Sequence, residues 1–184
     1  MTINVEREIK LRFESGEAAR TAVEDVGAIP LCARRLQEDS LFDWPDARLR
    51  DTRRLLRVRQ EDGRTTLTFK GPPEAATMKV REEVESTAGD GANLVTILER
   101  LGLEVWFRYQ KYRQEFEHAG VVISVDETPV GTFVELEGDE AGITRIASSM
   151  GRGQADYILD SYRNIFLKSR DARGLSMVDM VFDA

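Results

Sequence analysis

The feature that most constrains this fold is a strict alternation of apolar and charged residues in short segments of the chain. In EREIK, residues 6–10, charge occupies every second position, while Ile9 and Leu11 take the other parity. Because successive side chains of a strand point to opposite faces, a period of two predicts a strand with one charged and one apolar face. Alternation of this kind predicts strands at residues 2–13, 36–43, 53–60, 64–70, 78–86, 105–117, 120–127 and 131–137.

The segments between these strands carry signals for helices and tight turns. Ser15 is a candidate N-cap and Gly27 a stop signal, so residues 16–26 are predicted to form a helix. Further helices are predicted at 91–101, 139–150 and 154–169. A chain of 184 residues fits one well-packed domain. Since no linker or repeat divides it, we expect a single domain over residues 1–170 and a weakly patterned tail at 171–184.

The charged faces of the strands allow two interpretations. In an ordinary one-sided sheet they would face water. In a barrel they would close inward, and amphipathic helices would cover the apolar faces on the outside. The residue types favour the barrel, because these faces carry almost only Glu, Asp, Arg and Lys and few Thr, Ser or Gln residues. The predicted fold class is therefore α+β, a polar-lined barrel with helices packed outside.

The composition of the chain limits the kinds of partner that the protein is expected to bind. The net charge of -7 argues against a sequence-independent grip on nucleic acid. The single cysteine, Cys32, has no partner for an internal disulfide. Neither a long apolar run nor a basic leader before an apolar segment is present in the sequence, so membrane insertion and classical export are not indicated. We expect a cytoplasmic protein with no membrane and no nucleic-acid partner.

An interior lined by charges of both signs needs a ligand, because ionised groups at low dielectric are tolerated only when they are paired or bound to counter-ions. Carboxylates bind hard divalent cations, and Mg²⁺ commonly shares its site with phosphate oxygens. The inward acids are expected to be Glu6, Glu8, Glu83, Glu85, Asp126, Glu135 and Glu137. Guanidinium and ammonium groups match a polyanion. The inward bases are expected to be Lys10, Arg57, Arg59, Lys70, Lys79, Arg81, Lys111 and Arg113.

A set of short motifs in a fixed order makes a family resemblance definite. Glu6, Glu8 and Lys10 form an ExExK signature on the first predicted strand. It is followed by QEDSLFDWPD, LLRVRQ, LTFKGP, KVREEVE, KYR, VDE and GTFVELEG. Together these blocks cover roughly residues 1 to 165, and the chain resembles the CYTH-domain proteins of the triphosphate tunnel metalloenzyme superfamily. The resemblance is to its class IV adenylyl cyclase and thiamine triphosphatase-like branches.

This resemblance implies an eight-stranded antiparallel closed tunnel that binds a triphosphate compound with Mg²⁺ or Mn²⁺. It implies catalytic roles for Glu6, Glu8 and Lys10. The residues that resemble the triphosphate-binding bases are Lys10, Arg57, Arg59, Lys70, Arg81, Lys111 and Arg113. Those that resemble the metal-binding acids are Glu6, Glu8, Asp126, Glu135 and Glu137, with Glu83 and Glu85 as supporting groups.

The nucleophile decides which reaction such a site performs. Water attacking the terminal phosphorus of inorganic, thiamine or nucleoside triphosphate would give a triphosphatase, which we favour because hydrolysis needs no posed ribose. Attack by the ribose 3′-hydroxyl of ATP would instead give cyclic AMP and pyrophosphate. A non-catalytic polyphosphate or nucleotide-binding module is a third hypothesis. Many relatives carry a tyrosine where this chain has Leu41, and a homodimer is compatible with the family.

Overall fold

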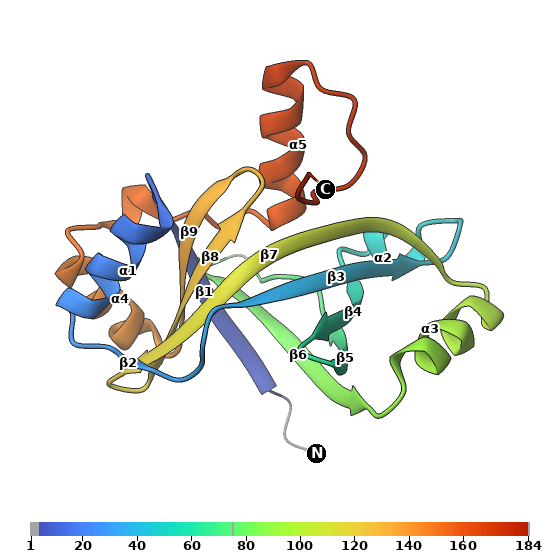
Figure 1. Ribbon diagram of the computed structural model, residues 1–184, viewed down its shortest axis with the longest axis horizontal. Coiled ribbons are helices and arrows are strands. Elements are labelled where there is room, and N and C mark those ends of the chain that lie inside the picture. The colour runs from blue at the N-terminus through green and yellow to red at the C-terminus, as the bar shows by residue number, and fades with distance from the viewer. Residues whose placement is uncertain (1–3, 75, 184) are drawn as a thin grey trace.

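The fold is built from antiparallel strands, with helices inserted between them and after the last one. The computed structural model describes residues 4–74 and 76–183 (Figure 1). The strands are β1 (Asn4–Phe13), β2 (Ile29–Pro30), β3 (Arg35–Asp43), β4 (Leu55–Glu61), β5 (Arg64–Lys70), β6 (Lys79–Ala88), β7 (Glu104–His118), β8 (Val121–Thr128) and β9 (Gly131–Glu137). The helices are α1 (Gly16–Asp25), α2 (Arg48–Asp51), α3 (Gly91–Arg100), α4 (Glu140–Ser149) and α5 (Tyr162–Arg173), with a 3₁₀ turn at Gln154–Asp156.

The sheet closes on itself into a barrel. Neighbouring strands follow the order β3, β4, β5, β6, β1, β9 and β8, and β7 pairs with both β8 and β3. The amino-terminal part of β7 pairs with β3 and its carboxyl-terminal part with β8. All of these pairings are antiparallel, and the two-residue β2 adds to β7 near Phe116. The expected eight-stranded closed barrel with helices outside is confirmed.

Side-chain caps begin the longer helices at the positions where the chain leaves the barrel. The Ser15 hydroxyl accepts a hydrogen bond from the Ala18 N–H at 3.1 Å, as its predicted capping role requires. Asp90 and Asp139 cap α3 and α4 in the same way. These caps satisfy backbone donors that have no partner inside the helix.

The predicted start of the last helix is wrong. The sequence pattern predicts a helix over 154–169, but the structure has a 3₁₀ turn, an extended stretch and then α5 from Tyr162. Ile158 exchanges two backbone hydrogen bonds with Lys10 of β1, at 2.9 and 3.1 Å. Ser161 caps α5 by accepting from the Asn164 N–H at 3.2 Å. Tertiary pairing with β1 therefore delays the helix by about two turns.

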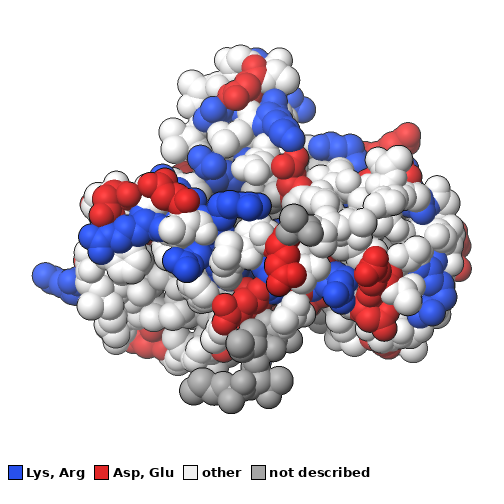
Figure 2. Space-filling model, turned by 180° about the vertical axis from the view of Figure 1, so that it is seen from behind, with Lys and Arg blue, Asp and Glu red and all other residues white. Residues whose placement is uncertain are grey.

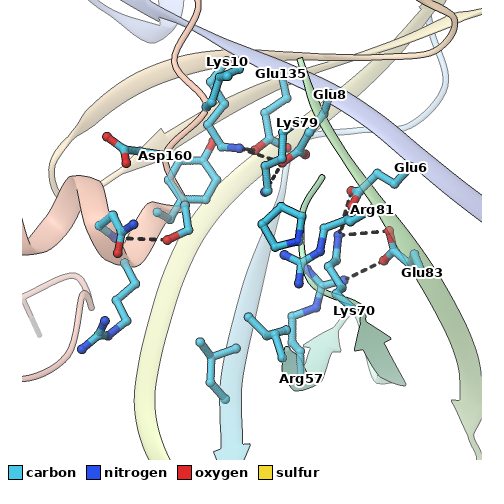
Figure 3. Close-up of a pocket in the computed structure, with 18 of the residues that line it drawn as sticks. Glu6, Glu8, Lys10, Arg57, Lys70, Lys79, Arg81, Glu83, Glu135 and Asp160 are labelled. Carbon is cyan, nitrogen blue, oxygen red and sulfur yellow. Dashed lines mark hydrogen bonds and ion pairs between the residues drawn. The ribbon is translucent and has the colours of Figure 1, made fainter. Parts of the chain in front are cut away.

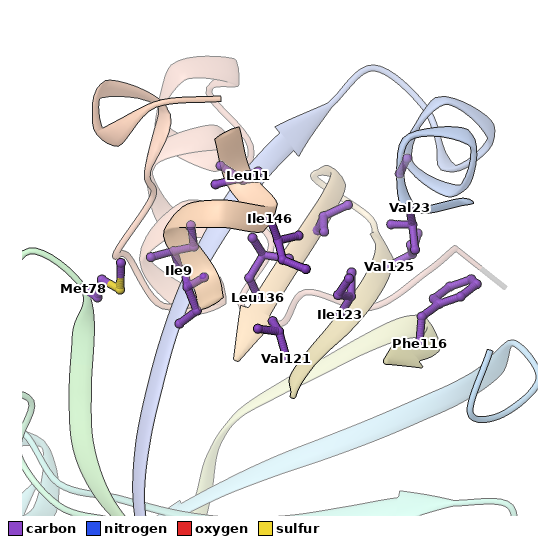
Figure 4. Packing of buried hydrophobic residues seen from close by; sticks show 14 residues of the cluster. Ile9, Leu11, Val23, Met78, Phe116, Val121, Ile123, Val125, Leu136 and Ile146 are labelled. Atoms are coloured by element: carbon purple, nitrogen blue, oxygen red, sulfur yellow. The ribbon is translucent and has the colours of Figure 1, made fainter. Parts of the chain in front are cut away.

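The main hydrophobic core lies outside the barrel, between its apolar outer face and the helices α1 and α4 (Figure 4). Ile9, Ile123 and Leu136 point outward from β1, β8 and β9 and are fully buried there. A second cluster packs α3 against β3 and β4. Since helices cover the apolar faces and the charged faces close inward, the one-sided sheet is excluded as the architecture.

The segment after α5 returns to the barrel and packs against β7. Met180 is fully buried, and its N–H and C=O bond to Arg108 O at 3.0 Å and Gln110 N at 2.8 Å. Its side chain joins a cluster with Phe107 and Phe166. The weakly patterned segment at 171–184 thus contributes a buried residue, and α5 itself runs to Arg173.

The outside of the barrel carries both signs of charge. On the face seen in Figure 2, acidic and basic side chains lie next to one another without a uniformly basic area. Among the described residues, no helix has the length and apolar character needed to cross a membrane.

Candidate active site inside the barrel

The barrel encloses a cavity of about 1010 Å³ whose walls are dominated by charged side chains. Every predicted site residue except Asp126 lines it: Glu6, Glu8, Lys10, Arg57, Arg59, Lys70, Arg81, Glu83, Glu85, Lys111, Arg113, Glu135 and Glu137. Alternation along the strands is the reason, since inward positions recur with a period of two. Apart from Asp160, which precedes α5, the side chains labelled in Figure 3 converge from different strands on this common space.

Strand β1 organises the acidic part of the cavity because it lies between β6 and β9. Its Glu8 is opposite Lys79 on β6 and Glu137 on β9, while Lys10 is opposite Glu135. Directly paired residues have Cβ atoms about 5 Å apart. The ExExK signature therefore meets acids and bases from both neighbouring strands.

Lysines neutralise most of these carboxylates. Lys70 Nζ lies 2.7 Å from both oxygens of Glu6 and 3.0 Å from Glu83. Lys10 Nζ lies 3.0 Å from Glu8 and 3.0 Å from Glu135. Burial opposes ionisation of Glu8, but the ammonium groups of Lys10 and a neighbouring lysine outweigh burial and hold its pKa well below the usual range. This part of the site is a compact network of buried ion pairs.

Glu137 is a cavity carboxylate outside this network of ion pairs. It has no ion pair within the part of the chain that the structure describes. Although Glu137 is exposed, desolvation by the atoms around it and the negative charges of Glu6 and Glu8 raise the pKa of Glu137 to about 7. A carboxylate repelled by its neighbours is the kind of group that a cation stabilises.

The acids offer only oxygen donors, which is the set that Mg²⁺ and Mn²⁺ prefer. Their present positions do not form a closed metal site, since no three carboxylate, imidazole or thiolate side chains among residues 4–74 and 76–183 have metal-binding spacing. Lysine ammonium groups occupy that space instead, notably Lys70 beside Glu6 and Lys79 beside Glu8. The oxygen donors suit a hard divalent cation. To bind one, Glu6 and Glu8 would have to release the lysine ammonium groups that they now contact.

Two arginines of β4 form the next part of the wall. Arg59 donates to both oxygens of Asp39, at 2.9 and 3.2 Å, and Arg57 Nε lies 3.5 Å from the same carboxylate. Burial opposes ionisation of Asp39, but these guanidinium groups lower its pKa. Arg57 also reaches Thr68 and Glu85. Sequence reasoning missed Asp39, although its parity on β3 matches that of the cavity-lining Leu41.

Asp126 lies behind the cavity wall and its oxygens are already engaged. Arg113 donates to both oxygens at 2.7 and 2.6 Å, and Lys111 and the Tyr162 hydroxyl donate at 2.8 and 2.6 Å. Its side chain is inaccessible to water. Burial and the adjacent Arg113 lower the pKa of Lys111 to about 8. The arrangement orients two cationic side chains toward the cavity and leaves little room for a cation at Asp126.

Two tyrosines complete the lining. Tyr162, at the start of α5, lies with its ring 5.2 Å from Lys10 Nζ and 4.9 Å from Lys111 Nζ. Tyr109 of β7 is buried at the same end, and the two rings are 6.3 Å apart. Alternation along β7 gives Tyr109 the same face as Lys111, whereas Tyr162 reaches these lysines through the docking of α5 on the barrel.

Comparison with known proteins identifies the family. A family model described as the CYTH domain matches residues 4–162. The chain belongs to the CYTH domain family. A protein of Methanocaldococcus jannaschii named "putative adenylate cyclase" is 30% identical over 134 residues, which cover 72% of this chain and 76% of that protein.

Solved structures share the CYTH fold with this chain. A Vibrio parahaemolyticus protein described as a "putative adenylate cyclase" superposes with a TM-score of 0.79, at 22% identity over 90% of this chain and 99% of its own. A Hippeastrum protein, described as a "putative adenylyl cyclase" with a dominant triphosphatase activity, superposes with a TM-score of 0.67, at 19% identity over 94% and 97% of the two chains. At these identities the likeness shows the fold.

Proposed function

We propose that this CYTH protein is a metal-dependent triphosphatase that binds its substrate along the barrel cavity. The observation that supports this most strongly is the coexistence, in the barrel cavity, of basic side chains from β1, β4, β5, β6 and β7 with a carboxylate that has no basic partner. The bases match a chain of phosphoryl groups, and the carboxylates match the cation that accompanies such a chain. Simple polyanion binding would not require the acids.

The basic side chains would bind the phosphoryl oxygens. The residues assigned this role are Lys10, Arg57, Arg59, Lys70, Arg81, Lys111 and Arg113. In the ligand-free protein, Lys10 pairs with Glu8 and Lys70 pairs with Glu6. Phosphoryl oxygens would replace these carboxylates as partners of the two ammonium groups, which would release Glu6 and Glu8. Charge that develops on the phosphoryl group during transfer is stabilised by such preorganised donors. Glu6, Glu8 and Lys10, which converge in the cavity, are the proposed catalytic residues.

The released carboxylates would then hold Mg²⁺ or Mn²⁺. We assign this role to Glu6, Glu8, Glu83, Glu85, Glu135 and Glu137. When bound, the ion supplies positive charge to phosphoryl oxygens and activates the nucleophile. For Asp126 we propose a positioning role instead, because its hydrogen bonds fix Lys111 and Arg113.

Adenylate cyclisation is the second candidate, and the name of the M. jannaschii relative favours it. Both reactions would use the seven basic residues above, which we call the triphosphate cradle. They differ in the nucleophile and in the phosphorus attacked, because water attacks the terminal phosphorus and releases the diphosphate, whereas the ribose 3′-hydroxyl attacks the α-phosphorus and releases pyrophosphate. The Hippeastrum protein carries both descriptions in its name, with the triphosphatase activity called dominant. Hydrolysis makes the smaller demand on this cavity, because water needs no ribose-binding pocket.

The deciding experiment is phosphorus NMR of the protein with Mg²⁺ or Mn²⁺ and, in separate samples, tripolyphosphate, thiamine triphosphate and ATP. We expect orthophosphate and the matching diphosphate, and we expect chelation to stop the reaction. Glu6→Gln should reduce the rate at least about a hundredfold, because it removes a carboxylate from the cation site. Glu99→Gln, on the exposed surface of α3, is the matched control and should leave the rate unchanged.

Other products would point elsewhere. Cyclic AMP and pyrophosphate from ATP would identify a cyclase. Saturable binding of tripolyphosphate without any product would identify a binding module. Full turnover by Glu6→Gln in the presence of chelator would refute the metal assignment.

A further inference from the structure

A group of arginines lines the cavity where α2, β7 and α5 meet, beyond the proposed triphosphate cradle. Arg50 comes from α2, Arg53 and Arg54 from the turn before β4, and Arg163 from the first turn of α5. We call these four residues the arginine rim. Together they add four positive charges to one cavity that already contains the bases of the cradle.

The rim is built into the fold through Asp43 and Trp106. The Asp43 carboxylate is buried and accepts hydrogen bonds from the backbone N–H groups of Leu49 and Arg50, at 3.0 and 3.1 Å, and from Arg50 Nε at 3.0 Å. The Trp106 ring lies 4.6 Å from the Arg50 guanidinium and 4.8 Å from that of Arg163. These contacts hold Arg50 and Arg163 near each other despite their like charge.

Most of the rim lacks a counter-ion. Within residues 4–74 and 76–183, Arg50 pairs with Asp43, whereas Arg53, Arg54 and Arg163 have no carboxylate within ion-pair distance. Burial and the positive charges of Arg50 and Arg170 lower the pKa of Arg163. Arg53 and Arg54 are exposed to water, whereas Arg163 is half-buried beside Arg50, and a bound anion would neutralise these neighbouring guanidinium groups.

The backbone at Arg53 is a further sign of a specific arrangement. Its φ of 56° lies in the left-handed region, which disfavours residues other than Gly, Asn and Asp. Strained residues of this kind persist where the surrounding structure enforces them, often beside a binding site. The turn places the positive charge of Arg53 two residues before β4, the strand that carries Arg57 and Arg59.

We propose that the arginine rim is a subsite for phosphoryl groups beyond the first three, so that the substrate class is linear inorganic polyphosphate. This inference rests on the proposed function, since the rim acts as an extension of the occupied triphosphate cradle. A nucleoside is neutral and would leave these guanidinium groups unpaired. The Trp106 ring packs against two arginines, which compete with a nucleobase for its faces.

Calorimetry with inorganic phosphate chains tests the subsite independently of turnover. The ligands are tripolyphosphate, longer linear polyphosphates of increasing length, and ATP, each with chelator at constant ionic strength, so that the proposed metal-dependent hydrolysis does not proceed during the titration. We expect the wild-type protein to bind the longer chains more tightly than tripolyphosphate. Arg53→Asn with Arg163→Gln should weaken long-chain binding about tenfold, as expected for lost charge-assisted hydrogen bonds, and should leave tripolyphosphate binding within about twofold.

The substitutions are chosen so that a loss of binding cannot be explained by a loss of folding stability. Asparagine tolerates a positive φ, so Arg53→Asn should keep the melting temperature. Arg100→Gln with Arg145→Gln, at exposed positions of α3 and α4, is the control for loss of two positive charges.

Three results would overturn the subsite. These are no preference for longer chains, an equal loss for tripolyphosphate in the variants, and a selective loss for ATP, which would show that the rim binds the nucleoside end. If no ligand is turned over but the chain-length preference and its loss in the variants are observed, the hydrolase proposal fails and the subsite stands.

Discussion

At the scale of single residues, the interior of this protein is held together by opposite charges. Buried ion pairs cost desolvation energy that their attraction recovers only when the geometry is good and the remaining polar atoms are satisfied. The Asp126 carboxylate meets this condition with three donating side chains, and Glu6 meets it through Lys70. Glu137 does not, which makes it the residue where binding and stability oppose each other.

Glu137→Gln is therefore expected to stabilise the metal-free protein in a pH-dependent way. The folded-state pKa of Glu137 is about 7, above its usual 4.5, so ionisation costs stability as pH rises through this window. The variant and the wild type should unfold with equal free energy near pH 4. Above pH 7 the variant should gain about 1 kcal/mol, since exposure of the side chain screens the repulsion.

Urea unfolding at several pH values, with chelator present, measures this difference. Mg²⁺ should stabilise the wild type more than the variant. A variant that is less stable than the wild type at pH 8 would show that Glu137 has a favourable partner.

The alternation of side-chain direction along each strand explains how much of the site could be predicted from the sequence. Alternation placed the acids and bases on inward faces, and the cavity contains all of those predicted except Asp126. It could not show which charges would pair, because pairing depends on register between strands distant in sequence. The Tyr162 hydroxyl, for example, reaches Asp126 only through the docking of α5.

At the scale of elements, strands were predicted better than the carboxyl-terminal region. The period of two sets strand positions locally, and the observed bounds of β5 and β9 are those predicted. From residue 158 into the first turns of α5, apolar residues at 158, 162, 165 and 166 follow a helical period. Backbone pairing of Ile158 with Lys10 overrides that pattern. The short α2 and β2 carried no periodic signal of their own.

The carboxyl-terminal segment can be tested as a structural element. Met180 is fully buried against Phe107 and Phe166, so Met180→Ala should lower the free energy of unfolding by about 3 kcal/mol. Met177→Ala is the control, because Met177 is exposed in the same segment and its loss should change stability by less than about 0.5 kcal/mol. Chemical denaturation measures both. Equal effects of the two substitutions would show that this segment does not contribute to the core.

At the scale of the whole molecule, the closed barrel keeps charges together that would separate in an open sheet. A ligand that binds only the closed form must stabilise it by mass action. Tripolyphosphate with Mg²⁺ at about one hundred times its Kd should add about 2.7 kcal/mol, which for a chain of this size raises Tm by roughly 5–10 °C. Thermal unfolding followed by circular dichroism measures the shift.

Sulfate at matched ionic strength is the control for that experiment. It screens charges without spanning the cavity, and we expect a much smaller shift. An equal shift with sulfate would mean that the interior responds to salt in general and has no site shaped for a phosphate chain.

The closure of the barrel through β7 and β3 has a consequence for how the chain is made. Partners so far apart in sequence meet late, because loop closure must precede their contacts. Until then, the sheet has open edges, which are the usual starting points for aggregation. The charged inner faces of β1, β4, β6 and β7 are strongly hydrated while the sheet is open, which would oppose the association of such intermediates. The residues proposed to grip phosphate would thus also act as gatekeepers for the nascent protein.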